Sequence, residues 1–428
     1  MHLTYRQTCR VCGSPALTKV IDLGPQHLQG SFIGADGKLP PLRKIETALV
    51  RCDPLRDERA CGLLQMTVSV PPTILYADYW YRSGTNRTMT DHLGGIANEL
   101  VEMINKPTAR VLDIGCNDGT LLRHYPSSYV RYGIDPSDAA TSVADDVQVV
   151  NDLFPSEQLT SLTRGKTFDV ITSIAMFYDL EDPTAFARAV KQHLTPDGVW
   201  CFEMSYMPAM LRCNSYDTIC HEHLEYYSLA VLEYILRQAS MKVVRVSLND
   251  CNGASIRVHA THSDNFLFDG DAQALASLRE LRQEEFDLQL DTDEPYRNFQ
   301  DAIERHKTEL SSLLRRLKSA GKKVHIYGAS TKGNTILQTC GINGSLVECA
   351  AERNPKKFGG RTLGTNIPIV SEEESRGRKP DYYLVLPWHF KAEFMERERA
   401  MLEAGVGFIF PLPQIEIISR SHDAKYAA

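Results

Sequence analysis

A short stretch, residues 216–228, brings together two histidines, three carboxylates, a thiol and three phenols. Such a mixture is costly to bury, because every buried polar group needs a partner. An extended backbone would place His221 and His223 on one side and Cys220 and Glu222 on the other. A polar surface loop is the alternative interpretation, since clusters of titratable groups mark only some functional sites. Two small-residue loops, one upstream and one downstream, favour a functional site.

Length and composition limit the class of protein. A chain of 428 residues is too long for one ordinary core and predicts two or three domains. The net charge of −7 argues against a nucleic-acid partner, and no apolar run or leader pattern indicates a membrane span or signal peptide. Eleven scattered cysteines favour reduced thiols and a metal site over a disulfide scaffold. We therefore expect a cytoplasmic protein without a membrane or nucleic-acid partner.

Four cysteines near the start of the chain have the spacing of a metal site. Cys9 and Cys12 are separated by two residues, as in a zinc knuckle, and Cys52 and Cys61 form a second pair with a wider gap. Four thiolates complete a tetrahedral structural zinc site that has no open position. Four free cysteines are the alternative, because the second gap is wider than usual.

A tyrosine-rich segment follows, in which Tyr76, Tyr79 and Tyr81 surround Trp80. These large amphipathic rings suit either a domain joint or the roof of a pocket with hydroxyls pointing inward. We favour the roof, because the next residues lead into a helix expected over 90–104.

A glycine loop follows the apolar strand that begins at Arg110, and a helix is expected after the loop. Gly115 and Gly119 allow the backbone to approach a ligand, with the helix N-terminus behind it. The loop lacks the three-glycine dinucleotide fingerprint. A second strand ends at Asp135, where a carboxylate suits the hydroxyls of a ribose.

Alternating strands and helices continue beyond this loop. The fourth strand is expected at 168–173, and residues 194–198 are expected to form the turn before the fifth. This order resembles the class I S-adenosylmethionine-dependent methyltransferases. The resemblance implies that Asp113 lies near the amino acid part of the cofactor and that residues after the third strand hold the adenine. The implied cofactor-binding residues are Asp113, Gly115, Asn117, Gly119, Asp135, Asp152 and Leu153.

Nearly the whole chain resembles the sugar C-methyltransferases that act on nucleotide-linked 4-keto-deoxysugars. The shared features are the cysteine-rich start, the tyrosine segment, the methyltransferase core, the His-Glu-His stretch and the last domain. The resemblance implies that the His-Glu-His stretch lies at the reacting sugar, with His223 as general base and Glu222 beside it. Two positions depart from the family pattern, because Cys220 stands where tyrosine is usual and Phe177 where histidine is usual. Substrate placement, stereochemistry and the methylated carbon therefore stay open.

The expected reaction explains why these residue types are needed. A sugar carbon is nucleophilic only beside a carbonyl, so a base such as His223 removes the C3 proton of a 4-keto sugar. Donors hold the enolate oxygen, with His221, Tyr76 and Tyr79 as candidates. The carbon then attacks the sulfonium methyl in line. A zinc site of Cys220 and the two histidines is the alternative, although adjacent ligands seldom reach one ion.

Two further stretches are expected to bind the substrate. Ser255 and Arg257 follow the sixth strand and either contact the sugar or diphosphate or belong to a plain strand. The last domain contains another strand, small-residue loop and helix, which would hold a diphosphate through backbone amides and through Ser330, Thr331 and Lys332. A degenerate duplicate that only stabilises the chain is the alternative.

The sequence thus predicts an α/β protein of three domains. Residues 1–75 are expected to bind zinc, residues 76–290 to form a Rossmann-like class I methyltransferase domain, and residues 291–428 to form a second Rossmann-like domain for the nucleotide sugar. We expect a monomer or small homo-oligomer that methylates a nucleoside-diphosphate 4-keto-6-deoxysugar, with the nucleotide base and sugar configuration open. The alternatives are O- or N-methylation of a sugar, a zinc-ribbon scaffold with a relic cofactor pocket, and a nicotinamide oxidoreductase.

Overall fold

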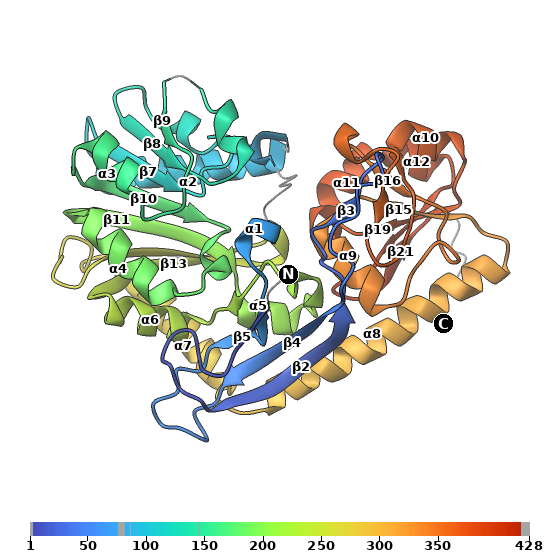
Figure 1. Ribbon diagram of the computed structural model, residues 1–428, viewed down its shortest axis with the longest axis horizontal. Coiled ribbons are helices and arrows are strands. Elements are labelled where there is room, and N and C mark those ends of the chain that lie inside the picture. Colours follow the sequence, from blue (N-terminus) through green and yellow to red (C-terminus); the bar gives the residue numbers. More distant parts are fainter. Residues whose placement is uncertain (1–2, 76–81, 86, 145, 421–428) are drawn as a thin grey trace.

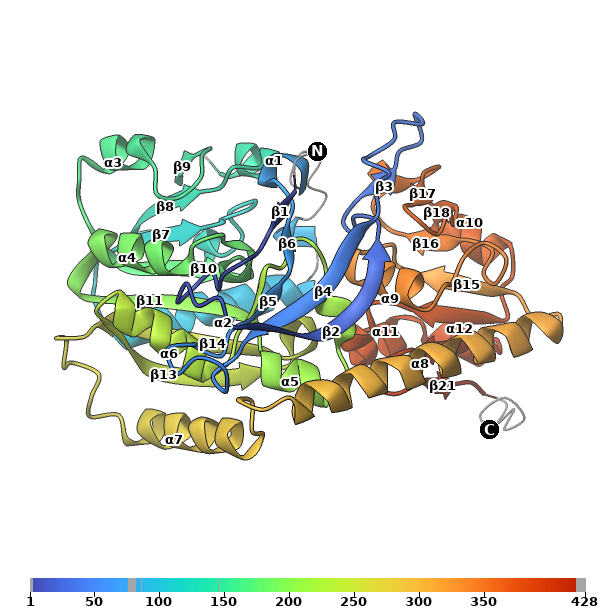
Figure 2. The same ribbon diagram turned by 60° about the horizontal axis from the view of Figure 1, so that its bottom comes forward.

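The computed structural model describes residues 3–75, 82–85, 87–144 and 146–420, which form two lobes (Figure 1). One lobe holds a seven-stranded sheet and the other a six-stranded sheet. Strands β2 (Leu17–Gln26) and β4 (Ile45–Cys52) lie between the lobes (Figure 2). The long helix α8 (Glu294–Ser319) packs on β2 and on the second lobe, so it ties the N-terminal region to the end of the chain.

The N-terminal region forms a small antiparallel sheet in the order β12-β5-β4-β2. Its edge strand β12 (Glu225–Tyr226) comes from the reactive stretch and pairs with β5 (Leu64–Met66). A four-residue helix, α1 (Pro72–Leu75), follows this sheet. Two short strand pairs extend the region, and these join β1 (Thr4–Tyr5) to β6 (Val68–Ser69) and β3 (Phe32–Ile33) to β17 (Arg361–Thr362). The N-terminal region therefore contacts both the reactive stretch and the last part of the chain.

The seven-stranded sheet has the order β13-β14-β11-β10-β7-β8-β9, and its strands β7 to β11 are parallel. The winding direction reverses between β7 and β10, and ligands of such sheets bind at the carboxyl ends there. The strands are β7 (Arg110–Ile114), β8 (Val130–Ile134), β9 (Gln148–Val150), β10 (Phe168–Ile174), β11 (Leu194–Ser205), β13 (Met241–Asn249) and β14 (Ser255–His262). The helices are α2 (Arg87–Ile104), α3 (Glu157–Thr163), α4 (Pro183–His193), α5 (Met207–Arg212), α6 (Leu229–Gln238) and α7 (Ala272–Asp287).

Two local predictions in this sheet are wrong. A single 3-10 turn, Leu122–His124, follows the glycine loop where a helix was expected. Pro126 explains the stop, because the residue before a proline avoids the helical conformation, and Tyr125 has a ψ of 148°. Residues 194–198 belong to β11 itself rather than to a turn before it.

The six-stranded sheet has the order β18-β16-β15-β19-β20-β21, which also reverses its winding at its first strand, β15. The strands are β15 (Val324–Tyr327), β16 (Ala350–Glu352), β18 (Ile369–Ser371), β19 (Tyr382–Val385), β20 (Gly407–Phe410) and β21 (Glu416–Ile418). The helices are α9 (Thr331–Thr339), α10 (Glu372–Gly377), α11 (Lys391–Arg397) and α12 (Arg399–Glu403). The predicted α/β architecture with a second Rossmann-like sheet is confirmed. Within the described residues, no helix has the length and apolar character needed to cross a bilayer.

Candidate active site

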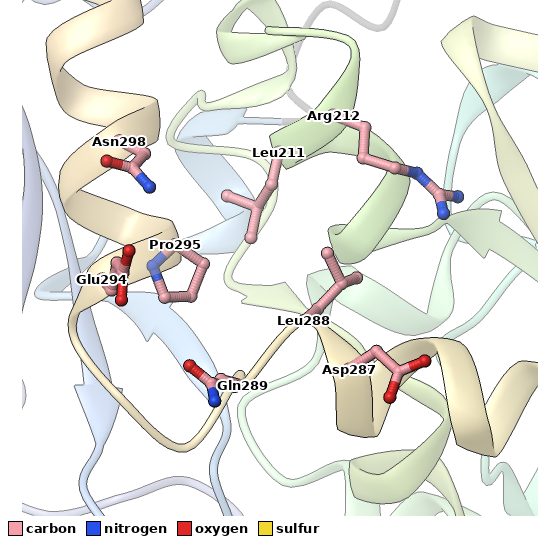
Figure 3. A pocket seen from close by; sticks show the side chains of 8 residues that line it. All are labelled: Leu211, Arg212, Asp287, Leu288, Gln289, Glu294, Pro295 and Asn298. Atoms are coloured by element: carbon pink, nitrogen blue, oxygen red, sulfur yellow. The ribbon is translucent and has the colours of Figure 1, made fainter.

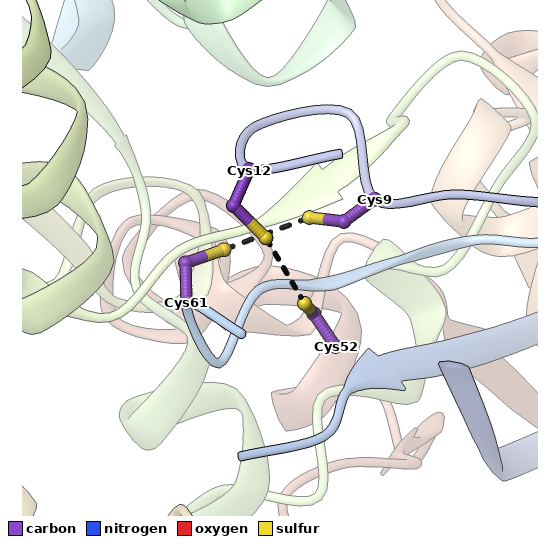
Figure 4. A group of neighbouring side chains, drawn as sticks. All are labelled: Cys9, Cys12, Cys52 and Cys61. Carbon is purple, nitrogen blue, oxygen red and sulfur yellow. Dashed lines mark hydrogen bonds between the residues drawn. The ribbon is translucent and has the colours of Figure 1, made fainter. Parts of the chain in front are cut away.

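Four cysteine side chains converge beside the end of β4 (Figure 4). The Sγ atoms of Cys9 and Cys61 are 3.5 Å apart, and those of Cys12 and Cys52 are 3.4 Å apart. A tetrahedral zinc ion with Zn–S bonds of about 2.3 Å places its sulfur ligands about 3.8 Å from one another. The four thiols therefore fit a structural zinc ion, and the alternative of four unrelated cysteines does not fit this geometry.

Two carboxylates lie at the ends of neighbouring strands in the seven-stranded sheet. Asp113 is buried at the end of β7, and its Oδ1 accepts a hydrogen bond of 2.6 Å from the Thr172 hydroxyl. Asp135 follows β8 and accepts the backbone N–H groups of Asn117 (2.9 Å) and Ser137 (2.8 Å). Burial, together with the charge of Asp135, raises the pKa of Asp113 to about 7. Such a carboxylate pair suits a ligand that carries positive charge.

The loop between these strands requires glycine at two positions. Gly115 and Gly119 have φ values of 75° and 72°, and a Cβ at Gly119 would lie 2.8 Å from Val143. Asp152, beyond β9, accepts the backbone N–H of Leu153, whose side chain is 61% exposed. These residues surround the carboxyl ends of β7, β8 and β9, and their contacts with a cofactor stay predictions.

The reactive stretch is buried rather than lying on the surface. It begins with the 3-10 turn η5 (Tyr216–Thr218), continues through a turn at 220–222, and becomes a strand only at β12. The backbone N–H of His223 donates to the Cys220 carbonyl (3.1 Å), which closes the turn. The surface-loop alternative and the extended backbone are therefore both wrong for this segment.

The two histidines of the stretch face different surroundings. His221 is 1% exposed, with its Nδ1 2.7 Å from Gln29 Oε1 and its Nε2 3.2 Å from a backbone carbonyl of β4. His223 is half-buried, and its Nδ1 lies 2.8 Å from the Thr218 carbonyl oxygen. Because a carbonyl oxygen only accepts, the proton of a neutral His223 sits on Nδ1 and the lone pair on Nε2. The ring of His223 also packs on Tyr178, with centroids 4.3 Å apart.

Glu222 and Cys220 are held in tightly packed surroundings. A Cβ at Gly30 would lie 1.6 Å from Glu222 Oε1, so only glycine leaves room for this carboxyl. Burial raises the pKa of Glu222 to about 7, against the opposing charge of Lys357. Cys220 is fully buried, and burial raises its pKa well above the usual range. In the described part of the chain, Cys220 and the two histidines form no group with ligand spacing, so the alternative zinc site is wrong.

The second lobe contributes groups to the same place. Trp388, directly beyond β19, donates its Nε1–H to Asp217 Oδ2 (2.8 Å) in the reactive stretch. Lys332 lies in the first turn of α9. Burial raises the pKa of Asp217 against the opposing charge of Lys332, whereas burial and the Lys332 charge together lower the pKa of His223. Ser330 caps α9 by accepting the Gly333 N–H (3.0 Å), and Thr331 follows it. The sequence singled out Lys332 but not its closeness to His223, because the two residues come from different lobes.

Arg257 lies in a network of ion pairs with little exposure. Its Nε donates to Glu203 Oε2 (2.8 Å) and its Nη1 to Glu99 Oε2 (2.7 Å). The Nε2 of His92 also lies 2.6 Å from Glu203 Oε1, and Ser255 Oγ donates to a nearby backbone carbonyl. A guanidinium with two carboxylate partners has fewer donors left for a diphosphate, so the substrate role of Arg257 and Ser255 stays a prediction.

Phe177 belongs to the core. It is 1% exposed and packs against Trp200, with ring centroids 5.3 Å apart. The next residue, Tyr178, is the one that contacts His223. The sequence carried no local signal for Tyr178, because its contact with His223 forms only in the folded chain.

A surface pocket of about 310 Å³ lies where α7 leads into α8 (Figure 3). It is lined by Leu211, Arg212, Asp287, Leu288, Gln289, Glu294, Pro295 and Asn298. None of the predicted site residues lines it. The predicted roof residues Tyr76 and Tyr79 lie outside the described residues.

Comparisons with known proteins match most of the chain. Three family models match, described as "Putative zinc binding domain" over residues 9–76, "Methyltransferase domain" over 86–246 and "C-methyltransferase C-terminal domain" over 250–413. The curated C-methyltransferase NovU of Streptomyces niveus is 29% identical over 416 residues, which cover 96% of each chain.

Solved methyltransferase structures also match part of the chain. The magnesium protoporphyrin IX methyltransferase ChlM of Synechocystis PCC 6803 with bound SAH has 15% identity and a TM-score of 0.33, covering 42% of this chain and 89% of that one. CalS10 with bound SAM, an amino pentose methyltransferase from Micromonospora echinaspora, has 14% identity and a TM-score of 0.30, covering 40% and 90%.

The sheet order, the acidic strand ends and the four-thiol cluster define a methyltransferase with a zinc-binding N-terminal domain. The C-terminal part of the chain matches the C-methyltransferase C-terminal domain, and 96% of the chain is similar to a curated C-methyltransferase. These matches support an S-adenosylmethionine-dependent C-methyltransferase.

Proposed function

We propose that the protein transfers a methyl group to C3 of a nucleoside-diphosphate 4-keto-6-deoxysugar, with His223 as the general base. The observation that carries this proposal is the orientation of His223. Its Nδ1 lies 2.8 Å from the Thr218 carbonyl, which leaves the lone pair of Nε2 to accept a proton. Burial, and the charge of Lys332, lower the pKa of His223 to about 4, so the imidazole is neutral near pH 7.

The proton balance of the reaction follows from the 4-keto group. His223 takes the proton from C3, the C–H electron pair forms an enolate with the carbonyl, and C3 then bonds to the methyl carbon as the thioether leaves. S-adenosylmethionine supplies the electrophilic methyl group when it is bound. The ammonium of Lys332 lies near His223 and would stabilise negative charge on the enolate oxygen. His221 is hydrogen-bonded to Gln29, so we propose that it stabilises the conformation of the reactive stretch and does not contact the substrate.

The proposed cofactor position lies at the carboxyl ends of β7 and β8. Asp113 and Asp135 present two carboxylates there, which fits a ligand with an ammonium and a sulfonium. Asp135 would accept hydrogen bonds from the ribose hydroxyls. Gly115, Asn117 and Gly119 would line the cofactor along the backbone of the loop. As the resemblance implies, Asp152 and Leu153 would hold the adenine.

The proposed nucleotide-sugar position lies at the start of α9 and in the loop before it. Ser330 and Thr331 begin this helix, whose N-terminal N–H groups favour a diphosphate. Lys332 would lie between the diphosphate and the reacting sugar of the bound substrate. The eleven cysteines form no disulfide in the described part of the chain, which suits a reducing compartment, so we place the reaction in the cytoplasm.

Transfer of a carbon-13 methyl group from labelled S-adenosylmethionine tests this function. The substrates are a set of dTDP- and GDP-linked 4-keto-6-deoxysugars, with the matching 4-hydroxy sugars as controls. We expect NMR correlations from the new methyl group to C3 with a keto sugar and no transfer to the 4-hydroxy sugars. A methyl group on oxygen or nitrogen would instead establish the alternative reaction. No transfer to any keto sugar, with normal binding of the methyl donor, would contradict the proposal.

A further inference from the structure

Arg10 lies inside the metal knuckle, between Cys9 and Cys12, yet its side chain reaches into the neighbouring sheet. Its Nη1 donates to Gln65 Oε1 (3.2 Å) and to the carbonyl of Met66 (2.9 Å), both in β5. Its Nη2 donates to Ser69 Oγ (2.8 Å). These bonds fix the guanidinium along β5, the strand that pairs with β12 of the reactive stretch.

The same guanidinium faces a buried carboxylate of β12. Arg10 Nε lies 3.6 Å from Glu225 Oε1, and neither side chain is exposed. Within the described residues, neither carboxylate oxygen of Glu225 has a hydrogen-bond partner. Arg10 Nε is also 3.6 Å from Glu181 Oε2, whose side chain is 45% exposed, so Glu225 is the buried one of the two carboxylate partners. Loss of Arg10 would leave the buried Glu225 carboxylate without this partner, which is strongly unfavourable. Arg10 thus links the metal knuckle to β12.

The residue between this strand and His223 is held on both sides. The carbonyl of Leu224 accepts the N–H of Met66 (2.9 Å) in β5, and the N–H of Leu224 donates to the Tyr178 carbonyl (2.7 Å). The ring of Tyr178 is the one that packs on His223. A shift of β12 along β5 would therefore move the imidazole relative to its neighbours.

We propose that Arg10 is a positioning residue for His223, so that the metal knuckle sets the geometry of proton abstraction as well as the fold of the N-terminal domain. A metal ion held by Cys9 and Cys12 fixes the backbone on both sides of Arg10. The fixed guanidinium of Arg10 holds Glu225 of β12 against β5. The position of β12 in turn fixes the position of His223. This inference rests on the proposed role of His223.

The test uses Arg10→Gln and Glu225→Gln in the full-length protein, with Arg59→Gln as the matched control. Arg59 lies between the other two cysteines, its side chain is 80% exposed, and it pairs with Asp57. Four quantities are measured for each variant: bound zinc, affinity for S-adenosylmethionine, the kcat and KM of C3 proton exchange in a keto sugar, and nitrogen-15 NMR signals of His223. The NMR signals report the tautomer without need of turnover.

We expect Arg10→Gln and Glu225→Gln to keep their zinc, their affinity for the methyl donor and a KM within about twofold of wild type. Their kcat should fall about 30- to 100-fold, because a misplacement of about 1 Å can cost about 100-fold in rate. The His223 signals should change from one Nδ1–H tautomer to a mixture, and Arg59→Gln should match wild type in all four.

Unchanged His223 signals and unchanged kcat in both variants would overturn the inference. Parallel loss of zinc, cofactor affinity and kcat in Glu225→Gln would also overturn it, because the contact would then only hold the fold together. If Arg10→Gln does not fold, Glu225→Gln decides. Absence of exchange in the wild type, with the tautomer change present in the variants, would overturn the proposed function and leave the positioning role of Arg10 standing.

Discussion

The two Rossmann-like sheets have the same winding but present opposite charges at their carboxyl ends. In the first lobe, Asp113 and Asp135 end the neighbouring strands β7 and β8. In the second lobe, Lys332 and Lys357 lie beyond β15 and β16, and the acid at the end of β16, Glu352, lies 3.7 Å from the Lys357 ammonium. Under the proposed function, the acidic end of the first sheet would take the cationic methyl donor, and the lysines of the second lobe would take the diphosphate.

Interactions from the two lobes also meet in the reactive stretch. His223 belongs to a stretch between the lobes and feels the Lys332 charge from the second one. Its neighbour Leu224 is bonded to the first lobe through the Tyr178 carbonyl (2.7 Å). Under the proposed function, His223 would therefore lie where a methyl donor from one lobe and a sugar from the other meet.

Loss of the acid in the first lobe should have the largest effect. In Asp135→Asn, we expect the affinity for S-adenosylmethionine to fall about 100-fold, since hydrogen bonds to a charged partner contribute about 1.5–3 kcal/mol each. Affinity for the nucleotide sugar should stay unchanged, as measured by calorimetry. Asp138→Asn is the control, because that side chain is 69% exposed and pairs with Arg82. Equal losses of affinity for the methyl donor and for the nucleotide sugar would contradict the assignment of the two ligands to different lobes.

Loss of the cation in the second lobe should reverse the pattern. In Lys332→Met, we expect the affinity for the nucleotide sugar to fall about 30-fold, with unchanged affinity for the methyl donor. Because the Lys332 charge lowers the pKa of His223, its removal raises that pKa. The acid limb of the kcat/KM profile should therefore move to higher pH. The exposed Lys356→Met is the control, and an acid limb that moves to lower pH would contradict this assignment.

A smaller effect concerns proton release on cofactor binding. The pKa of Asp113 is about 7 instead of the usual 3.8, so near pH 7 about half of this carboxyl is protonated before binding. A cationic ligand favours the carboxylate and lowers this pKa, so binding should release about half a proton at pH 7. Calorimetry in buffers of different ionisation enthalpy measures the release, and Asp113→Asn should abolish it. Proton uptake in the wild type would mean that the ligand does not neutralise Asp113.

Local patterns predicted the elements that carry the site. The spacing of Cys9 and Cys12, the glycine loop after β7 and the small-residue loop after β15 each come from adjacent residues, so the sequence displays them directly. The helix expected after the glycine loop is absent because a single residue, Pro126, stops it. This signal was present in the sequence.

Contacts between distant parts of the chain could not be predicted in the same way. His221 and His223 are neighbours in sequence, but Gln29 of the first domain binds one and the Thr218 carbonyl binds the other. The ion pairs of Arg257 depend on α2 and β11, which pack on β14 only in the folded protein. Contacts between residues far apart in the sequence therefore determine which of the predicted residues lie near His223.

Solvent deuterium exchange at C3 of a nucleotide-linked 4-keto-6-deoxysugar is the most direct test of the role of His223. Wild type and His223→Asn are compared by NMR with S-adenosylhomocysteine present to prevent methyl transfer, and cofactor affinity is measured in both to verify folding. We predict exchange at C3 in the wild type and none above background in His223→Asn. Exchange that persists at the wild-type rate in His223→Asn would contradict the assignment of the base.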